Sequence, residues 1–183
     1  MVLFAYMKCE IRLEAARVEL FAKPGVGGII EKREGGIDYI LIQERFKEDA
    51  PLENGLIEIP AGKIREFENI YDTLRREIRE ETGLTVVEIQ GENESAIYEA
   101  KGYKVLDYTP FSSCQNIQGE YPIMVQTFIC KTKGELLPET NETKNIRWIP
   151  LNELKNLLDR NESAFYPMHV MALKKYLGIK LPM

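Results

Sequence analysis

Three closely spaced glutamates, Glu77, Glu80 and Glu81, have a spacing that could do chemistry. On a helix their carboxylates, at positions i, i+3 and i+4, would converge and would raise one another's pKa unless they shared a cation. Oxygen-only donors of this kind suit hard ions such as Mg²⁺, Mn²⁺ or Ca²⁺. The spacing therefore indicates a divalent-cation site. The alternative is a solvated helix with Arg–Glu pairs that contribute little stability.

The surrounding residues predict the helix that would carry these acids. Asn69 is a suitable N-cap, and Gly83 can end a helix in the left-handed conformation. The apolar positions fall on one narrow stripe, made of Ile70, Leu74 and Ile78. Glu81 lies inside that stripe. A carboxylate that faces a core is costly unless a positive group meets it, so a purely solvated helix does not explain Glu81.

The whole stretch from Gly62 to Leu84 fits the pattern Gly-x5-Glu-x7-Arg-Glu-U-x-Glu-Glu-x-Gly-U, where U is a bulky aliphatic residue. Each fixed position matches by chance roughly one time in 15, so the whole set coincides at about 10⁻⁸ per start position. The pattern is that of the Nudix box, and the chain resembles the Nudix hydrolases. The preceding residues 59–63, Ile-Pro-Ala-Gly-Lys, resemble the ADP-ribose and ADP-sugar pyrophosphatase branch.

The resemblance implies a fold and a set of roles. The expected fold class is α/β, a mixed β-sheet sandwich flanked by helices, in which the box forms a loop, a helix and a loop. Glu77, Glu80 and Glu81 would bind the metal and take part in catalysis, and the carbonyl of Ala61 would be a further metal ligand. Support of the box would fall to a second set of residues: Gly62, Glu68, Arg76 and Gly83. Arg76 and Glu68 would pair and so brace the loop against the helix.

The implied activity is metal-dependent hydrolysis of the pyrophosphate bond of a nucleoside diphosphate linked to another group. The favoured substrate is ADP-ribose or another ADP-sugar, which would give AMP and a sugar phosphate, and the favoured cofactor is Mg²⁺ or Mn²⁺. Other Nudix substrates are alternatives: coenzyme A, NADH, dinucleoside polyphosphates and modified nucleoside triphosphates. A non-catalytic nucleotide-sensing module usually has a degenerate box, whereas this box is complete. An acidic interaction domain without a ligand is the remaining alternative.

Four residues outside the box are also candidates by resemblance. Arg45, at the end of a predicted strand, matches an arginine that often faces the substrate, and a plain strand end is the alternative. Glu142 lies in an acidic loop where this branch often has a catalytic carboxylate, and a solvated loop is the alternative. Pro110 and Phe111 resemble part of a substrate-binding loop. That loop lacks its usual glycine here, and Gln115 stands near the place of a usual acid, which weakens the case for ADP-ribose.

Length and composition describe one globular domain. The 183 residues are 44% hydrophobic and 29% charged, which is enough for one well-buried core. We expect residues 1–183 to form a single Nudix domain with residues 1–23 as an N-terminal strand extension. The net charge of −5 argues against backbone-driven binding of nucleic acid, so the expected partner is a small nucleotide. It also means that metal ions must attract the anionic pyrophosphate.

The N-terminal segment and the cysteines bear on assembly and location. Residues 9–23 read as extended structure, and in ADP-sugar relatives such a segment often lies across a partner subunit. A homodimer is therefore expected, with a simple edge strand as the alternative. Cys9, Cys114 and Cys130 form no C-x-x-C pattern, which is typical of reduced thiols in a cytoplasmic protein. The short apolar segment 1–7 does not make a signal peptide, and no apolar run reaches membrane-spanning length.

Several local features are predicted around the box. The segment 24–28, Pro-Gly-Val-Gly-Gly, is interpreted as a turn, because its glycines do not continue to a dinucleotide fingerprint. Residues 34–37 are predicted to form a hairpin turn. Residues 56–62 are predicted as one strand that runs into the box. An extra hairpin is expected within residues 92–102.

Near the C-terminus, Asn152 is the expected N-cap of a helix, and a last amphipathic helix is expected over residues 163–177, restarted after Pro167. Its inward residues are predicted to be Val170, Leu173 and Leu177. His169, the only histidine, could border a base pocket with Phe165 and Tyr166, or pack in the core. A single histidine also excludes zinc sites with several histidines and disfavours a Ser–His–Asp triad.

Overall fold

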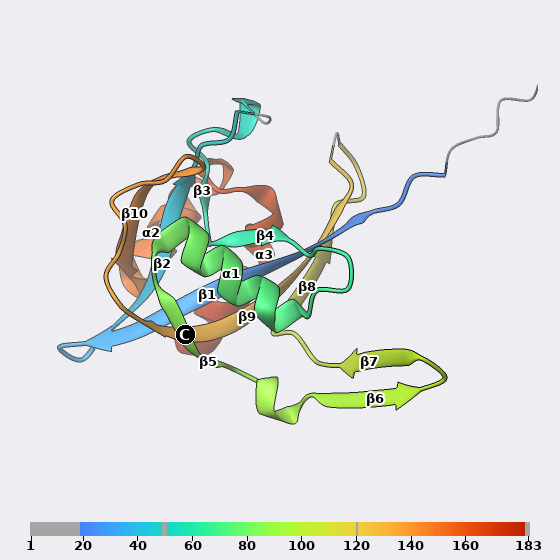
Figure 1. Cartoon of the computed structure of the whole chain (residues 1–183). Helices are drawn as coiled ribbons and strands as arrows, with labels where there is room; N and C mark the ends of the chain where they lie inside the picture. Colours follow the sequence, from blue (N-terminus) through green and yellow to red (C-terminus); the bar gives the residue numbers. More distant parts are fainter. Residues whose placement is uncertain (1–18, 49–50, 120, 182–183) are drawn as a thin grey trace, which may run out of the picture.

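The computed structural model describes residues 19–48, 51–119 and 121–181 (Figure 1). The expectations for residues 1–18, which include Cys9 and most of the N-terminal extension, lie outside the described residues. The elements follow in this order: β1 (Lys23–Glu34), β2 (Ile37–Arg45), η1 (Pro51–Glu53), β3 (Ile57–Glu58), β4 (Ala61–Lys63), α1 (Ile70–Thr82), β5 (Thr85–Ile89), η2 (Glu92–Glu94), β6 (Ala96–Ala100), β7 (Tyr103–Asp107), β8 (Ser112–Gln115), β9 (Ile123–Lys133), β10 (Thr143–Pro150), α2 (Leu151–Arg160), η3 (Glu162–Ala164) and α3 (Pro167–Lys180).

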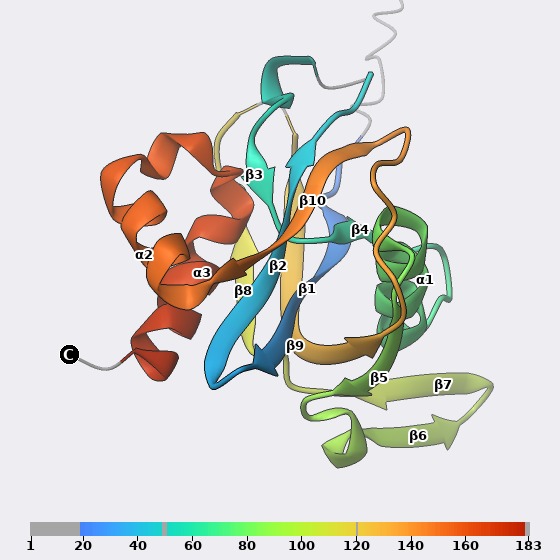
Figure 2. The same ribbon diagram turned by 90° about the vertical axis from the view of Figure 1, so that its left-hand side faces the viewer.

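An eight-stranded mixed sheet forms the centre of the fold. Its main order is β10-β2-β1-β9-β5, while β3 pairs with β2, β4 with β1 and β8 with β9. Strands β1 and β9 run parallel, and the other pairs are antiparallel. Strands β6 and β7 form a separate two-stranded sheet, which projects from the body of the molecule in both views (Figures 1 and 2).

Helices cover both faces of the sheet, with α1 on one side and α2 and α3 on the other (Figure 2). Neighbouring residues of β1, Ile29 and Ile30, point to opposite faces, because side chains alternate along a strand. Ile29 belongs to the core cluster with Leu154 and Leu173, whereas Ile30 belongs to the cluster with Leu74 and Ile78 of α1. The predicted α/β class, a mixed sheet between helices, is confirmed.

The interpretation of residues 24–28 as a turn is wrong, because they lie in β1. The glycines are needed for space. A Cβ atom on Gly28 would lie 2.9 Å from Ile78 Cδ1 and 3.2 Å from Leu74 Cδ1, and one on Gly25 would lie 3.3 Å from the carbonyl oxygen of Gly62. The glycines therefore let α1 and β4 approach β1 closely.

The single strand predicted for residues 56–62 is divided in the structure. Strand β3 pairs with β2 and strand β4 pairs with β1, so the chain crosses from one neighbour to the next. Pro60 lies at the break, where its missing N–H costs no ladder bond, and its carbonyl accepts a 2.9 Å hydrogen bond from Gly28 N. This crossing brings Ala61 and Gly62 beside α1.

The remaining local predictions have mixed outcomes. Gly35 and Gly36 form the expected turn, both with positive φ. The extra hairpin is present, but it spans Ala96 to Asp107 and so begins and ends later than the expected residues 92–102. Helix α2 begins at Leu151, with Pro150 in the cap position, so Asn152 as N-cap is wrong.

The last helix does not begin at residue 163: η3 ends at Ala164, and α3 begins at Pro167, close to the expected restart. Its predicted inward residues, Val170, Leu173 and Leu177, are buried. His169, Phe165 and Tyr166 are buried as well, which favours the interpretation as core. Within the described ranges, no helix is both long and apolar enough to cross a membrane.

Candidate active site

Both ends of the box helix α1 form as the sequence predicts. The Asn69 side chain accepts a 2.9 Å hydrogen bond from Tyr71 N, and Gly83 ends the helix with a φ of +78°. Gly83 is also close to Leu137, because a Cβ atom at this position would lie 2.8 Å from Leu137 Cγ. These two caps fix the register of the helix and hence the direction in which each glutamate points.

Glu81 is buried in the interior, with a relative exposure of 3%. Its Oε2 atom accepts hydrogen bonds from Gln43 Nε2 at 2.8 Å and from Ala61 N at 3.1 Å. Its Oε1 atom has no hydrogen-bond partner, and the Lys47 ammonium lies 3.8 Å from it. Desolvation, followed by the charge of nearby Glu58, raises the pKa of Glu81 to about 8. One oxygen of this carboxylate is therefore fixed by hydrogen bonds, and the other has only the Lys47 ammonium nearby.

A second buried carboxylate, Glu58, lies next to Glu81. Its Oε2 atom accepts a 3.1 Å hydrogen bond from Arg45, and Gln43 Nε2 lies 3.5 Å from its Oε1 atom. Burial raises the pKa of Glu58 and the Arg45 charge opposes that rise. Gln43 thus stands between two carboxylates and orients one oxygen of Glu81. Neither Gln43 nor Glu58 was predicted from the sequence.

Arg45, a candidate substrate contact, is held by protein groups on three sides. It pairs with Glu58 and with Glu53, at 3.1 and 2.8 Å, and its guanidinium lies 4.7 Å from the ring centroid of Tyr166. Its side chain is 15% exposed. In this arrangement Arg45 neutralises the Glu58 carboxylate, which is a structural role that the sequence did not predict.

Glu77 lies against the box glycine. A Cβ atom on Gly62 would fall 1.9 Å from the carboxyl carbon of Glu77, so that any other residue at position 62 would displace this carboxylate. Arg76 Nη1 donates a 2.6 Å hydrogen bond to Glu77 Oε1. The conformation of Gly62 is not left-handed, so glycine is required here for space and not for its φ angle.

Arg76 and Glu68 form the expected pair. Arg76 Nε and Nη2 donate to the two oxygens of Glu68 at 2.8 and 2.9 Å, a bidentate geometry, and Nη2 also lies 3.3 Å from the carbonyl oxygen of Lys63. The guanidinium lowers the pKa of Glu68 to about 2. The pair ties the loop that precedes α1 to the helix itself.

Glu80 and Glu142 are the exposed acids of the site, with side chains 54% and 50% exposed. Glu80 lies 3.3 Å from Arg76, and Glu142 pairs with Lys47 at 2.6 Å. Since Lys47 also lies near Glu81, it links the acidic loop before β10 to the box helix. Lys47, too, was not predicted from the sequence.

Phe111, a candidate substrate contact that follows Pro110, makes contacts away from α1. Phe111 packs against the core cluster on the α3 side of the sheet, with its ring 6.3 Å from that of Tyr176, and its carbonyl oxygen accepts a hydrogen bond from Lys175. His169 also contributes to packing: it is buried, its Nδ1 atom accepts a 3.3 Å hydrogen bond from Ile59 N, and burial lowers its pKa to about 3.

The donor set suits a hard divalent cation by its chemistry. The Oε1 atom of buried Glu81 has no hydrogen-bond partner and is an oxygen ligand that a hard cation accepts. Ala61 donates its backbone N–H to the other oxygen of the same carboxylate, and the Glu77 carboxylate lies against Gly62, the residue after Ala61. Across the described residues no three side chains of Asp, Glu, His or Cys are already grouped around one point. Arg76 and Lys47 hold the carboxylates in their present positions, so the ligand roles of Glu77, Glu80 and Glu81 stay predictions.

Comparison with known families identifies the class of protein. Residues 22–169 match the NUDIX domain family, and this range includes the box, the central sheet and the start of α3. The chain therefore belongs to the Nudix family. The expected resemblance is confirmed, and the interpretation as a Nudix pyrophosphohydrolase is supported at the level of the family.

One curated relative, the ADP-ribose pyrophosphatase of Bacillus subtilis, is 31% identical over 90 residues. The match covers 49% of this chain and 45% of the relative, so it spans less than half of that protein's length.

Solved structures show the same fold at low identity. The NUDIX domain of Shewanella oneidensis NrtR, in complex with ADP ribose, has a TM-score of 0.61 at 11% identity and covers 90% of this chain and 92% of its own. An Ap4A hydrolase of Caenorhabditis elegans has a TM-score of 0.52 at 16% identity, with coverages of 88% and 99%. A MutT protein of Methanosarcina mazei has a TM-score of 0.56 at 16% identity, with coverages of 91% and 99%.

Proposed function

We propose that this protein hydrolyses the pyrophosphate bond of a nucleoside diphosphate linked to another group. The observation that carries the proposal is the environment of Glu81. This carboxylate is buried on the apolar side of the box helix, one of its oxygens is fixed by Gln43 and Ala61, and the other has no hydrogen-bond partner. Such an arrangement is unfavourable by itself and becomes favourable when a cation is shared.

The groups that would hold Mg²⁺ or Mn²⁺ are Glu77, Glu80, Glu81 and the carbonyl of Ala61. When bound, the divalent ions would neutralise the negative charge that builds on the phosphate oxygens during hydrolysis. The oxygen-only donor set and the orphaned Glu81 oxygen support this assignment.

The protein's own residues prepare the site. Gln43 and the Ala61 N–H fix one oxygen of Glu81 and thereby the direction of the other. The Arg76–Glu68 pair keeps the loop in place against the helix. Lys47 carries a positive charge between Glu81 and Glu142, where it can meet an oxygen of the substrate phosphate.

Hydrolysis also needs a proton acceptor. As water attacks one phosphorus, its oxygen becomes part of one product, the bridging oxygen leaves with the other, and the proton passes to a carboxylate. The candidates are Glu80 and Glu142, which are both half-exposed and therefore accessible to water. Positioning and electrostatics would supply most of the remaining catalysis.

ADP-ribose or another ADP-sugar is the substrate that we propose, with AMP and a sugar phosphate as products. The name of the Bacillus subtilis relative and the Ile-Pro-Ala-Gly-Lys segment before the box support this choice. Arg45, Pro110 and Phe111 remain candidate substrate contacts by resemblance alone. A homodimer and a cytoplasmic location belong to the same proposal, and the free thiols of Cys114 and Cys130 suit a reducing compartment.

A product assay tests the proposal. The protein is incubated with Mg²⁺ or Mn²⁺ and a panel of ADP-ribose, other ADP-sugars, coenzyme A, NADH, dinucleoside polyphosphates and nucleoside triphosphates, and the released monophosphates are separated. We expect AMP from ADP-ribose or an ADP-sugar, and loss of that activity in Glu81→Gln. Hydrolysis of another member of the panel instead would contradict the proposed substrate and leave the proposed reaction in place. Tight binding of a nucleotide without hydrolysis would contradict the enzymatic function and favour a nucleotide-sensing module.

A further inference from the structure

The projecting β6–β7 hairpin has an exposed face without charged side chains in its centre. Side chains alternate between the two faces along each strand, and directly paired residues of neighbouring strands lie on the same face. One side of the hairpin carries Ala96, Tyr98, Ala100, Tyr103, Val105 and, at its base, Asp107; we term the first five residues the uncharged face. Tyr98 is 68% exposed, Tyr103 73% and Val105 48%. Tyrosine is enriched at protein interfaces, so two exposed tyrosines on one face indicate a contact surface.

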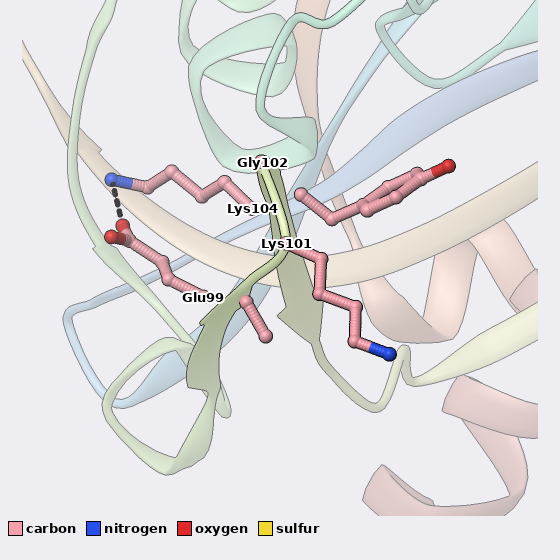
Figure 3. A pocket seen from close by; sticks show the side chains of 6 residues that line it. Glu99, Lys101, Gly102 and Lys104 are labelled. Atoms are coloured by element: carbon pink, nitrogen blue, oxygen red, sulfur yellow. Dashed lines mark ion pairs between the residues drawn. The ribbon is translucent and has the colours of Figure 1, made fainter.

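The opposite face of the hairpin is different. Leu106 packs against the core cluster that includes α1, so this face is directed toward the body of the molecule at its base. Nearer the tip it carries the ion pair between Glu99 and Lys104, at 2.9 Å. Figure 3 shows this pair on one side of the hairpin tip, while Lys101 extends away from it.

Two strands alone give little stability in water, and a third strand or a packed surface is usually needed. Among the described residues, neither β6 nor β7 pairs with any other strand. Each of its strands nevertheless has five residues, and the centre of the outward face is built from aromatic and aliphatic residues. These properties are typical of an element whose outer face packs against another molecule.

The charges at the two ends of the uncharged face identify that molecule. Asp107 lies at the base, on the same face and directly across from Ala96, and Lys101 lies at the tip. The tip is therefore basic and the base is acidic. A second hairpin placed antiparallel about a two-fold axis would bring each Lys101 to the Asp107 of the other copy, and the tyrosines would pack between these two ion pairs. A face with this charge order is complementary to itself, as isologous contacts require.

We propose that the uncharged face of the β6–β7 hairpin packs against the same face of a second copy of this chain, with Lys101 of each copy paired to Asp107 of the other. The surface lies outside the box, and the inference does not depend on the activity. The face is small, so the dimer is expected to have a dissociation constant of about micromolar order.

Sedimentation velocity of the full-length protein between about 1 and 200 µM tests this inference, since that range brackets a weak interface. The wild type should shift from the 21.1 kDa monomer to twice that mass as the concentration rises. Tyr98→Asp should weaken the dimer at least about 30-fold, because it places a charge in the centre of the contact. The matched control is Ile97→Asp, an adjacent and 57% exposed position on the opposite face, which should dimerise as the wild type does.

A charge exchange gives a test that misfolding cannot imitate. Lys101→Glu and Asp107→Lys should each weaken self-association at least about tenfold, because each places like charges together at both ends of the contact. An equimolar mixture of the two variants should recover the wild-type dimer mass, since both contacts are then again of opposite sign. The inference is overturned if the wild type is monomeric at every concentration, or if the mixture associates no better than either variant alone. It is also overturned if Tyr98→Asp dimerises as well as the wild type, which is the result expected of a dimer formed through residues 1–23.

Discussion

The Lys47 ammonium lies 3.8 Å from the Glu81 oxygen that has no hydrogen-bond donor, and among the described residues no other cationic side chain forms an ion pair with that oxygen. Lys47 is mostly buried, and it pairs at the same time with Glu142. It therefore holds a single positive charge beside the carboxylate that is expected to bind a divalent ion. A lysine in that place both compensates Glu81 and competes with the ion.

Replacing Lys47 with methionine should therefore tighten metal binding. The ammonium and the dication compete for the same carboxylate and repel each other, so we expect Lys47→Met to bind Mn²⁺ about fivefold more tightly than the wild type. Titration calorimetry in the absence of nucleotide measures this. Lys155→Met, an exposed lysine on α2 that pairs with Asp159, is the control and should leave the affinity unchanged. Weaker Mn²⁺ binding in Lys47→Met would contradict the prediction.

The environment of Glu81 predicts a pH dependence of stability. Its folded-state pKa of about 8 lies above the ordinary value of 4.5, so folding favours the protonated form. The contribution of Glu81 to stability is thus fully present below about pH 4.5 and is lost as the pH rises through about 8. In the presence of a chelator, Glu81→Gln should be more stable than the wild type by about 2 kcal/mol above pH 8 and similar to it near pH 4.5.

Urea denaturation of both proteins across this pH range gives the difference directly. Glu80→Gln is the matched control, because Glu80 is on the same helix and half-exposed. Its stability should follow the wild type at every pH. Parallel curves for Glu81→Gln and the wild type would show that Glu81 is ionised without cost in the folded protein.

The box helix could be predicted almost completely from the sequence, because its determinants are local. Asn69, Gly83 and the position of Glu81 on the apolar stripe all lie within one segment, and the 3.6-residue period places them relative to one another. The same reasoning could not identify Glu58. In the run Ile57-Glu58-Ile59 the alternation of a strand with one solvated face would turn Glu58 outward. All three residues are buried, because this part of the sheet is covered on both faces.

Gln43 and Lys47 were missed for a different reason. Their relevance depends on contacts with Glu81 that span 38 and 34 residues of sequence, and no local pattern indicates such contacts. The glycines of β1 gave the wrong interpretation for a related reason. Gly25 and Gly28 resemble turn residues in the sequence, whereas their function is to leave room for residues of β4 and α1.

The space at Gly62 predicts a selective loss of activity. Gly62→Ala would push the Glu77 carboxylate from its position, so we expect kcat to fall by about 100-fold. Stability should change little, because the displaced group is the end of a flexible side chain. Gly35→Ala is the control with the opposite expectation. Gly35 has a φ of +58°, and no heavy atom lies within 4 Å of a Cβ atom placed there, so this variant should lose about 1 kcal/mol of stability and keep its activity. Steady-state kinetics and thermal unfolding of both variants measure these effects. A Gly62→Ala variant as active as the wild type would show that Gly62 is not needed to position Glu77.

The contact between Glu142 and Lys47 predicts which carboxylate accepts the proton. Glu142 is half-exposed, lies in the loop before β10 and is joined through Lys47 to Glu81, so it can reach water close to the ion site. We expect Glu142→Gln to lower kcat by at least about 100-fold and to remove the acidic limb of the pH profile of kcat. Glu139→Gln, in the same loop, should leave both unchanged. If instead Glu142→Gln keeps the acidic limb and Glu80→Gln removes it while Mn²⁺ affinity is retained, then Glu80 is the base and Glu142 serves to position Lys47.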